Sequence, residues 1–373
     1  MGKKILVLVY GGRSTEHDIA CRSAAFVYRS LDRSLYDLHL VGVDKNGDWY
    51  PQTQTAAWEV DPVFLPLDRD FTRNNPPAVM PVNPRGALAA LCGLEASALA
   101  DCVFFPMIHG VSGEDGTLQG LFELAGVPFV GPDTLGSAVG MDKVVAKRLA
   151  ASAGIPIVPF VEINEEIWGE EKEAMCRRAI DVLGLPLFVK PARLGSSVGI
   201  QKVKTVEGLM PAVEQALQFD DKVLIEQGLE VREVECAMLG TMRAKPSVVG
   251  EVVLDAEFYS YEEKYAKNSR ATTRIPADLT PELTAEIQKL SARLFEVLAL
   301  YGMARVDWFL EKKTGQLYFN EVNTIPGFTQ VSHYPLFWAK SGKDATSLLS
   351  DLIGLSLRRA QIKSGLKREI PGC

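Results

Sequence analysis

Short apolar runs alternate along the first part of the chain with stretches of helical period. Residues 5–10 and 103–108 are such runs, and each predicts a buried strand. Amphipathic stretches at about 16–31 and 115–124 follow these runs and predict helices. A strand, a glycine-rich turn and a helix in repeated order are typical of a parallel α/β sheet.

The pattern changes where Gly154-Ile155-Pro156 ends a predicted helix at about 141–153. Strands are then predicted at about 158–163, 187–192, 199–203, 223–226, 231–239, 247–253, 305–311 and 317–323. Helices are predicted at about 168–183, 281–300 and 345–359. Residues 53–84 hold several prolines and little period, and we expect irregular loops there. The chain is therefore predicted to form an N-terminal α/β domain (1–135) and two α+β domains, a central one (136–220) and a C-terminal one (221–373).

Length and composition limit the class of protein. The 373 residues are enough for two or three domains with full cores, and 47% hydrophobic and 23% charged residues lie near the globular average. The net charge of −7 excludes a generally basic surface, so we expect no nucleic-acid partner. A local basic pocket for a small anion remains compatible with this charge.

The cellular location and the redox state of the cysteines are predicted from three features that the sequence does not show. The six cysteines form no CxxC pair, no apolar run approaches the ~20 residues that cross a membrane, and no secretory signal is visible. We therefore expect reduced thiols, no membrane partner and a cytoplasmic protein.

The predicted hairpin of residues 305–323 carries the strongest local pattern. With its turn centred on Thr314, side chains two apart share a face, and four polar groups stand together in two facing pairs: Asp307 with Glu321, and Arg305 with Asn323. Facing carboxylates destabilise a strand pair. A Mg²⁺ ion, which takes few protein oxygens and keeps waters and phosphates as other ligands, would remove the repulsion. The alternative is a solvated face with an Arg–Asp pair.

A second pattern is the sequence that runs from Lys190 to Gly199 through Ser196 and Ser197. Glycines let a backbone turn its N–H groups toward an anion, and the lysine and hydroxyl groups add donors. The sequence matches neither a Walker A loop nor a dinucleotide fingerprint. We interpret it as a hairpin tip over phosphates, with an ordinary Gly-Ser hairpin as the alternative.

Further polar groups follow predicted strand ends, where open α/β sheets bind ligands. Glu16 could hold an ammonium group or simply belong to a helix N-terminus, and His109 opens on the same edge of the sheet. The acceptors of Glu226 and Glu233 could contact a base and a ribose, although acidic loops are usually only solvated. The long aromatic and charged segment at 258–276 is typical of a lid or binding loop.

Taken together, these segments resemble the D-alanine–D-alanine ligases of the ATP-grasp superfamily. The resemblance runs in order from Gly11 to about Pro335, nearly the whole chain. Seven motifs carry it: Gly-Gly-Arg-Ser-Thr-Glu-His (11–17), His-Gly-Val-Ser-Gly-Glu-Asp-Gly-Thr-Leu-Gln-Gly (109–120), Met-Asp-Lys (141–143), Lys-Pro-Ala-Arg-Leu-Gly-Ser-Ser-Val-Gly (190–199), Glu-Lys-Tyr (263–265), Arg-Val-Asp (305–307) and Asn-Glu-Val-Asn-Thr-Ile-Pro-Gly (320–327).

The resemblance implies an ATP-grasp fold with ATP held between the two α+β domains. The residues that match the family's nucleotide contacts are Lys143, Lys190, Ser197, Glu226, Glu233 and Lys264. The residues that match its ligands for two Mg²⁺ ions, for which Mn²⁺ could substitute, are Asp307, Glu321 and Asn323.

The implied reaction joins two D-alanines through an acylphosphate, for peptidoglycan precursor synthesis. Glu16 would hold the first ammonium, with His109 near the first substrate. Arg305 and the Gly327 N–H would stabilise an oxyanion, and Ser332 would bind the second carboxylate. A hydrogen-bonded trio would close the lid at 255–276 over the site: Glu16, Ser196 and Tyr265.

Several alternatives stay open from the sequence. Ile19-Ala20 departs from the Val-Ser of many family members and removes one hydroxyl near the first subsite. The second substrate could be D-serine; Tyr265 argues against D-lactate. Another ATP-grasp carboxylate–amine ligase is disfavoured by Glu16 and His109, and a non-catalytic sensor by the complete set of metal ligands. The resemblance also implies a homodimer formed through the N-terminal domain.

Overall fold

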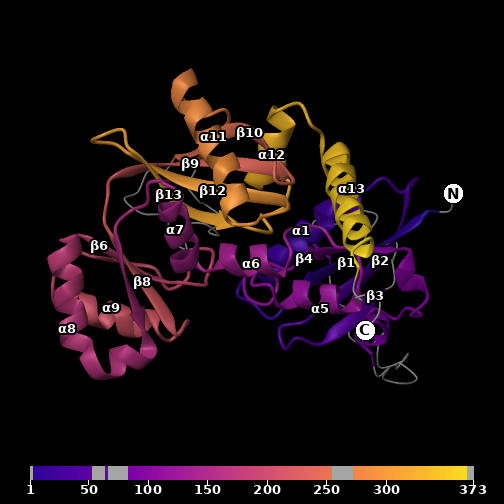
Figure 1. The fold of residues 1–373 in the computed structure, drawn as a ribbon, viewed down its shortest axis with the longest axis horizontal. Coiled ribbons are helices and arrows are strands. Elements are labelled where there is room, and N and C mark those ends of the chain that lie inside the picture. Colours follow the sequence, from indigo (N-terminus) through magenta and orange to yellow (C-terminus); the bar gives the residue numbers. More distant parts are fainter. Residues whose placement is uncertain (1–2, 53–63, 66–82, 254–271, 368–373) are drawn as a thin grey trace.

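The computed structural model describes residues 3–52, 64–65, 83–253 and 272–367. The described strands form three sheets, one in each of three domains (Figure 1). Most of the predicted loops at 53–84 and most of the predicted lid lie outside the described residues. No helix in the described ranges is long and apolar enough to cross a membrane.

The first sheet is mixed, with the order β3-β2-β1-β4. Its strands are β1 (Lys4–Gly11), β2 (Tyr36–Val43), β3 (Trp49–Gln52) and β4 (Cys102–Met107). β1 pairs in parallel with both β2 and β4, which confirms the predicted parallel core, and β3 adds an antiparallel edge. The apolar runs in β1 and β4 are buried, as strands covered on both faces of a sheet require.

Helices and short turns surround this sheet: α1 (His17–Ser30), α4 (Pro84–Leu91), the 3₁₀ turn η1 (Ala98–Ala100), α5 (Thr117–Ala125) and α6 (Thr134–Met141). The start of α4 shows how sequence sets a helix end. Asn83 accepts a hydrogen bond from the Gly86 N–H at 2.7 Å, and proline occupies the first helical position, where its missing N–H costs nothing.

The central domain has a four-stranded sheet with the order β5-β8-β6-β7. Its elements are β5 (Phe160–Asn164), α8 (Glu165–Leu183), β6 (Leu187–Pro191), β7 (Gln201–Val203), α9 (Leu209–Ala216) and β8 (Lys222–Gln227). The domain boundary predicted at 220/221 is wrong, because β8 lies between β5 and β6 and pairs with both. Val223 and Ile225 of β8 belong to the central core, so this domain extends to about residue 227.

The helix predicted at 141–153 is confirmed as α7 (Lys143–Ser152), which begins two residues later than predicted. The preceding helix α6 ends at Met141, and the two helices meet at Asp142. The Asp142 carboxylate accepts hydrogen bonds from the N–H groups of Val144 and Val145 and so caps α7. Ala146 and Ala150 of α7 pack into the core of the C-terminal sheet, so this helix belongs by packing to the C-terminal domain.

The C-terminal domain is built on a five-stranded antiparallel sheet with the order β11-β10-β9-β12-β13. Its strands are β9 (Val231–Gly240), β10 (Lys245–Val253), β11 (Thr272–Arg274), β12 (Gly302–Glu311) and β13 (Leu317–Asn323). Helix α11 (Pro281–Val297) packs with α7 on one face. Helices α12 (His333–Lys340) and α13 (Ala345–Ser364) pack on the other.

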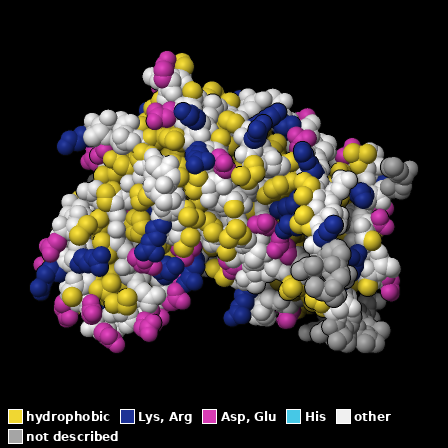
Figure 2. Space-filling view, viewed as in Figure 1, with side chains coloured by type: hydrophobic (Ala, Val, Ile, Leu, Met, Phe, Trp, Pro, Cys, Tyr) yellow, Lys and Arg dark blue, Asp and Glu magenta, His cyan; other side chains and the backbone are white. Residues whose placement is uncertain are grey.

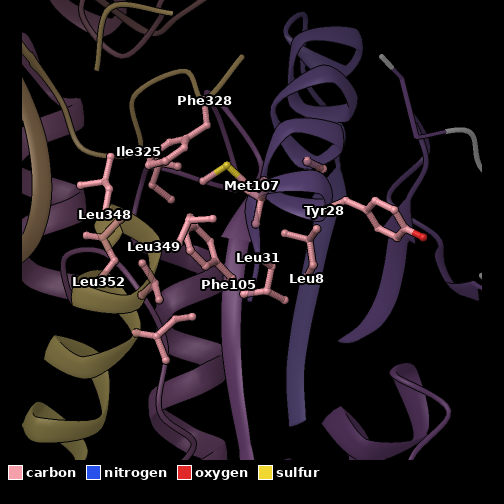
Figure 3. Packing of buried hydrophobic residues seen from close by; sticks show 14 of the residues in the cluster. Leu8, Tyr28, Leu31, Phe105, Met107, Ile325, Phe328, Leu348, Leu349 and Leu352 are labelled. Atoms are coloured by element: carbon pink, nitrogen blue, oxygen red, sulfur yellow. The ribbon is translucent and has the colours of Figure 1, made fainter. Parts of the chain in front are cut away.

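One hydrophobic core joins the N-terminal and C-terminal domains. Figure 3 shows Phe105 of the first sheet between Leu8 and the leucines of α13, with Ile325 and Phe328 of the loop after β13 above it. These last two residues flank Gly327, so the core anchors the loop that carries this predicted oxyanion donor. The central domain keeps a core of its own, and Figure 2 shows a notch between it and the N-terminal domain.

Candidate active site

A cavity of about 1290 Å³ is lined by residues of all three domains. It includes every predicted site residue that the structure describes: Glu16, His109, Lys143, Lys190, Ser196, Ser197, Glu226, Glu233, Arg305, Asp307, Glu321, Asn323, Gly327 and Ser332. Lys264 and Tyr265 lie outside the described residues. Segments that are more than 300 residues apart in sequence thus meet in one place.

The predicted facing pairs of the β12–β13 hairpin are confirmed: Asp307 lies opposite Glu321, and Arg305 lies opposite Asn323. A bulge between Asp307 and Trp308 shifts the register on the turn side, so the symmetric hairpin holds only at the site end. Glu235 of β9 lies opposite Asp307 on its other side. Three carboxylates therefore stand in one row across neighbouring strands, and sequence parity had identified only two of them.

Charge balance in this row depends on Arg305. Its guanidinium donates to Asp307 from Nε at 2.8 Å and from an Nη atom at 2.6 Å, and Asn323 donates to the same carboxylate at 2.9 Å. Burial, together with the charges of Glu235 and Glu321, raises the pKa of Asp307 to about 7, although Arg305 opposes the shift. The row therefore carries more negative charge than its arginine neutralises.

The donor set fits a magnesium ion. Asp307 and Glu321 offer facing carboxylates and Asn323 adds an amide, all oxygen ligands of the kind that Mg²⁺ prefers. In the part of the chain that the structure describes, no group of three or more His, Cys, Asp or Glu side chains is placed to hold a metal. A site with two carboxylates and an amide leaves positions for water and phosphate, which suits Mg²⁺ better than a metal that needs a full protein cage.

Lysines from two domains line the cavity beside the carboxylate row. Lys143 Nζ lies 3.0 Å from Glu321 and donates to the Leu194 carbonyl at 2.6 Å, which ties α7 to the Gly-Ser loop. Lys190 forms an ion pair with Glu226, and both side chains are buried. Glu226 thus lines the cavity, where a nucleotide contact was predicted for it, and also forms an ion pair with a lysine.

Lys147 is a buried charge that the sequence prediction missed. It is fully buried, lies 2.6 Å from Glu226 and donates to the Phe319 carbonyl at 3.0 Å. Burial alone would raise the pKa of Glu226, but Lys147 and Lys190 outweigh it and hold that pKa below the ordinary value. Burial lowers the pKa of Lys147, partly offset by Glu226. The sequence did carry a signal for Lys147: it lies four residues after Lys143, and residues four apart share one face of a helix.

The Gly-Ser loop contacts the N-terminal domain. Ser196 and Ser197 both adopt left-handed backbone angles, with φ of 54° and 59°, which L-residues rarely take. The Ser196 hydroxyl donates to Glu16, across 180 positions of sequence. Glu16 begins α1 without a side-chain cap, so the capping alternative does not account for its carboxylate.

Gly327 and Ser332 lie side by side at the start of α12. A Cβ atom at position 327 would lie 2.9 Å from Ser332 Oγ, so any larger residue there would displace this hydroxyl. Ser332 Oγ accepts a hydrogen bond from the Thr329 N–H at 2.9 Å and does not cap the helix. Its hydroxyl is therefore oriented beside the predicted oxyanion donor.

His109 is buried and supports the loop on both sides of Gly327. Nδ1 lies 2.9 Å from the Ile325 carbonyl, which fixes the proton on Nδ1, and Nε2 lies 2.9 Å from Ser23 Oγ. Ser23 Oγ in turn accepts from the Phe328 N–H at 3.1 Å. Both ring nitrogens are thus engaged by the loop and by α1, so His109 holds the loop in place.

Glu114 is a second support that the prediction missed, although it lies within the His109 motif. One carboxylate oxygen accepts from the Gly110 N–H at 3.0 Å. The other accepts from Thr324 and Ile325 N–H at 3.1 and 3.0 Å. Burial raises the pKa of this carboxyl, while His109 and backbone donors oppose the shift. Because Glu114 accepts hydrogen bonds from Thr324 and Ile325, it holds in place the backbone that leads into the Gly327 loop.

Three domains around a cavity with buried lysines, a Gly-Ser loop and a facing carboxylate pair define a ligase of the ATP-grasp class. The family comparison narrows the class: the family model described as D-ala D-ala ligase N-terminus matches residues 5–132, and that described as D-ala D-ala ligase C-terminus matches residues 149–354. The chain belongs to the D-alanine–D-alanine ligase family.

Individual relatives agree with this assignment. The chain is 42% identical to the D-alanine–D-alanine ligase of Thermoanaerobacter sp. (strain X514), over 96% of this chain and 97% of the relative. It is 39% identical to D-alanine–D-alanine ligase A of Escherichia coli K12, over 98% and 99% of the two chains.

Solved structures are similar over the same extent. The D-alanine–D-alanine ligase of Coxiella burnetii superposes with a TM-score of 0.79 at 31% identity, covering 98% of this chain and 97% of that one. The VanG D-Ala:D-Ser ligase of Enterococcus faecalis also has a TM-score of 0.79, at 32% identity over 95% and 100% of the chains.

Proposed function

We propose that this protein joins two D-alanines to D-alanyl-D-alanine and converts ATP to ADP and phosphate. The observation that carries the proposal is one cavity of all three domains that brings together two lysines, a facing carboxylate pair and the polar groups predicted to hold two amino acids. Family membership over nearly the full length supports the same reaction.

The first step is phosphoryl transfer, which needs positioning and charge neutralisation more than covalent help from the protein. A carboxylate oxygen of the first D-alanine attacks the γ-phosphorus and ADP leaves, giving an acylphosphate. Glu16 holds the ammonium group of this D-alanine. Lys143 and Lys190 neutralise the phosphates, and the backbone at 195–199 closes over them with Ser197. Glu226, Glu233 and Lys264 contact the nucleotide.

Bound Mg²⁺ would neutralise phosphate charge during this transfer, and the residues that would hold it are Asp307, Glu321 and Asn323. We propose two such ions, with Mn²⁺ as a possible substitute. The metal ligands of this chain are themselves oriented by Arg305 and by strand pairing.

The second step forms the peptide bond. The amine of the second D-alanine attacks the acyl carbon, the C–N bond forms through a tetrahedral intermediate, and phosphate leaves. Arg305 and the Gly327 N–H stabilise the oxyanion, a contribution typically worth ~3–4 kcal/mol per donor. Ser332 binds the carboxylate of the second substrate. The Glu16–Ser196 hydrogen bond would be completed by Tyr265.

The test is an ATP-dependent assay with D-alanine as the sole amino acid. Release of phosphate with equimolar dipeptide is expected. Absence of both products would refute the proposal. The likeness to a D-Ala:D-Ser ligase makes D-serine the second candidate for the acceptor. A competition assay with D-alanine, D-serine and D-lactate decides among them, and we expect the D-Ala–D-Ala product to dominate.

Assembly and location belong to the proposal as well. We propose a homodimer formed through the N-terminal domain, acting in the cytoplasm on peptidoglycan precursors. Sedimentation of the purified chain tests the dimer, and a mass of one chain would contradict it.

A further inference from the structure

We propose that His333 is a positioning residue for Arg305. Its ring fixes the Glu235 carboxylate, and Glu235 together with Asp307 holds the Arg305 guanidinium in the cavity. The inference rests on the proposed function, in which Arg305 stabilises the oxyanion of the second step.

The contacts form a chain from helix α12 to strand β12. His333 Nδ1 lies 2.6 Å from Glu235 Oε2, and the same oxygen lies 3.1 Å from Arg305 Nε. A carboxylate can only accept hydrogen bonds, so Nδ1 carries the proton. One oxygen of Glu235 therefore accepts a hydrogen bond from His333 of α12 and forms an ion pair with Arg305 of β12.

The second ring nitrogen is also engaged. His333 Nε2 lies 2.9 Å from Thr273 Oγ1 on the edge strand β11. In the neutral ring Nε2 accepts from the threonine hydroxyl, and in the charged ring it donates, so either form keeps both contacts. Thr273 pairs with Val252, which pairs with Glu233 two residues before Glu235. Thr273, Glu235 and Arg305 consequently share one face of the sheet.

Packing limits the freedom of the ring. It stacks on Phe337, one turn further along α12, with ring centroids 5.6 Å apart and planes inclined by 13°. Phe337 fills the space above Gly250, where a Cβ atom would lie 2.3 Å from the ring. Gly250 lies opposite Glu235. The residue that faces Glu235 thus has no side chain, and the aromatic stack occupies that place.

Arg305 needs this second anchor because Asp307 attracts it strongly. The guanidinium makes two hydrogen bonds to Asp307, which is also a predicted metal ligand. Glu235 of β9 meets the same Nε atom from the neighbouring strand, so two carboxylates together hold the guanidinium. Because His333 directly follows Ser332, the same turn of chain would set both the second-carboxylate group and the oxyanion arginine.

Two isosteric variants separate the ring contacts. The amide of asparagine reaches the place of Nδ1, and that of glutamine reaches the place of Nε2. His333→Asn can keep the donor to Glu235, whereas His333→Gln removes it and keeps a group toward Thr273. We expect kcat to fall about 10- to 100-fold in His333→Gln and less than about threefold in His333→Asn, with KM for ATP unchanged in both.

Positional isotope exchange in ¹⁸O-labelled ATP distinguishes positioning from a general loss of structure. A displaced Arg305 slows the second step and spares acylphosphate formation. The ratio of isotope exchange to dipeptide formation should therefore rise in His333→Gln and stay near wild type in His333→Asn. Thr273→Val, which removes only the outer contact, is the matched control and should change kcat less than about twofold.

Equal kinetics in the two His333 variants, or an unchanged exchange ratio in His333→Gln, would overturn the proposal. If His333→Gln fails to fold, Glu235→Gln weakens the same anchor from the other side and should raise the exchange ratio. An unchanged ratio there would overturn it equally. A wild-type protein that forms no dipeptide would instead refute the proposed function, so the two failures are distinguishable.

Discussion

At the scale of single residues, the site is a set of buried charges that balance one another incompletely. Glu235, Asp307 and Glu321 stand in one row, and cross-strand like charges destabilise a sheet. Arg305 and Lys143 offset part of that repulsion. A divalent cation would offset the rest, so the predicted metal ligands are held in an arrangement that favours cation binding.

The first prediction concerns Asp307→Asn. The variant keeps the shape of the side chain, leaves only one acceptor oxygen for Arg305 and Asn323, and removes the charge that would hold Mg²⁺. We expect kcat to fall at least about 100-fold, since loss of one electrostatic contact at the reacting centre typically costs that much. Phosphate release measures the loss. Melting should shift little, because the variant also removes a buried charge whose pKa burial raises.

Asp351→Asn serves as the control for that substitution. Asp351 lies on α13, where it pairs with Lys343 and is half-exposed. The same chemical change there should leave turnover intact. Full activity in Asp307→Asn would contradict the metal role of that residue.

Glu114→Gln tests the buried support of the Gly327 loop. A glutamine has one acceptor oxygen, so its amide group must face either the Gly110 N–H or the N–H groups of Thr324 and Ile325. We expect the free energy of unfolding to fall by about 2–3 kcal/mol, the value of hydrogen bonds to a buried charged group. Urea denaturation measures it. Glu123→Gln, on the surface of α5, is the control and should change stability by less than about 0.5 kcal/mol.

At the scale of elements, helix α7 carries Lys143, which is predicted to bind phosphate, and the buried Lys147, and it contacts both the central and the C-terminal domain. Its N-cap, Asp142, also pairs with Lys222 of β8 at 2.6 Å. Lys143 and Lys147 lie one turn apart on the face toward the cavity and Glu226. A change at the cap should therefore be felt at both lysines.

We predict different effects for two variants of Asp142. Asn is also a good N-cap and loses only the ion pair, whereas Ala loses both contacts. The free energy of unfolding should fall by about 1–2 kcal/mol in Asp142→Ala and by less in Asp142→Asn, as measured in urea. A larger loss in the asparagine variant would contradict the capping role.

The pH dependence of the pair has a definite sign. Burial raises the pKa of Asp142, but Lys222 and the capped N–H groups outweigh it and hold that pKa below its ordinary value of 3.8. A depressed folded pKa contributes stability that is present above the unfolded value and lost as the pH falls through the folded one. The stability difference between wild type and Asp142→Asn should therefore shrink only below about pH 4.

Local pattern predicted the elements better than their partners. Two-residue parity and a turn at Thr314 were enough to pair Asp307 with Glu321, because a hairpin pairs neighbouring segments. The bulge beside Trp308 could not be predicted, because the alternation of polar and apolar residues along the strand does not reveal it. Strand β8 was assigned to the wrong domain because a run of short strands looks alike in sequence whichever sheet each one joins. Pairings such as Lys147 with Glu226 depend on that assembly.

At the scale of the whole molecule, the cores decide which parts unfold together. One cluster combines β1, α1 and β4 with β9, α12 and α13, whereas the central domain has a separate core (Figure 1). Ile325 and Phe328 lie within the shared cluster (Figure 3). The loop that carries Gly327 is consequently as stable as the joint core. The central domain, which carries the Gly-Ser loop, can unfold while the joint core stays folded.

Hydrogen exchange followed by mass spectrometry tests this division with two matched variants. Leu349→Ala, on α13, creates a cavity in the joint core and should cost about 2–5 kcal/mol. Protection should fall in both β1 and β9, and that of β6 should be unchanged. Leu209→Ala, in the central core, should produce the reverse pattern. Loss of protection confined to the C-terminal strands in Leu349→Ala would show that the two sheets unfold independently. The Gly327 loop would then need another source of rigidity.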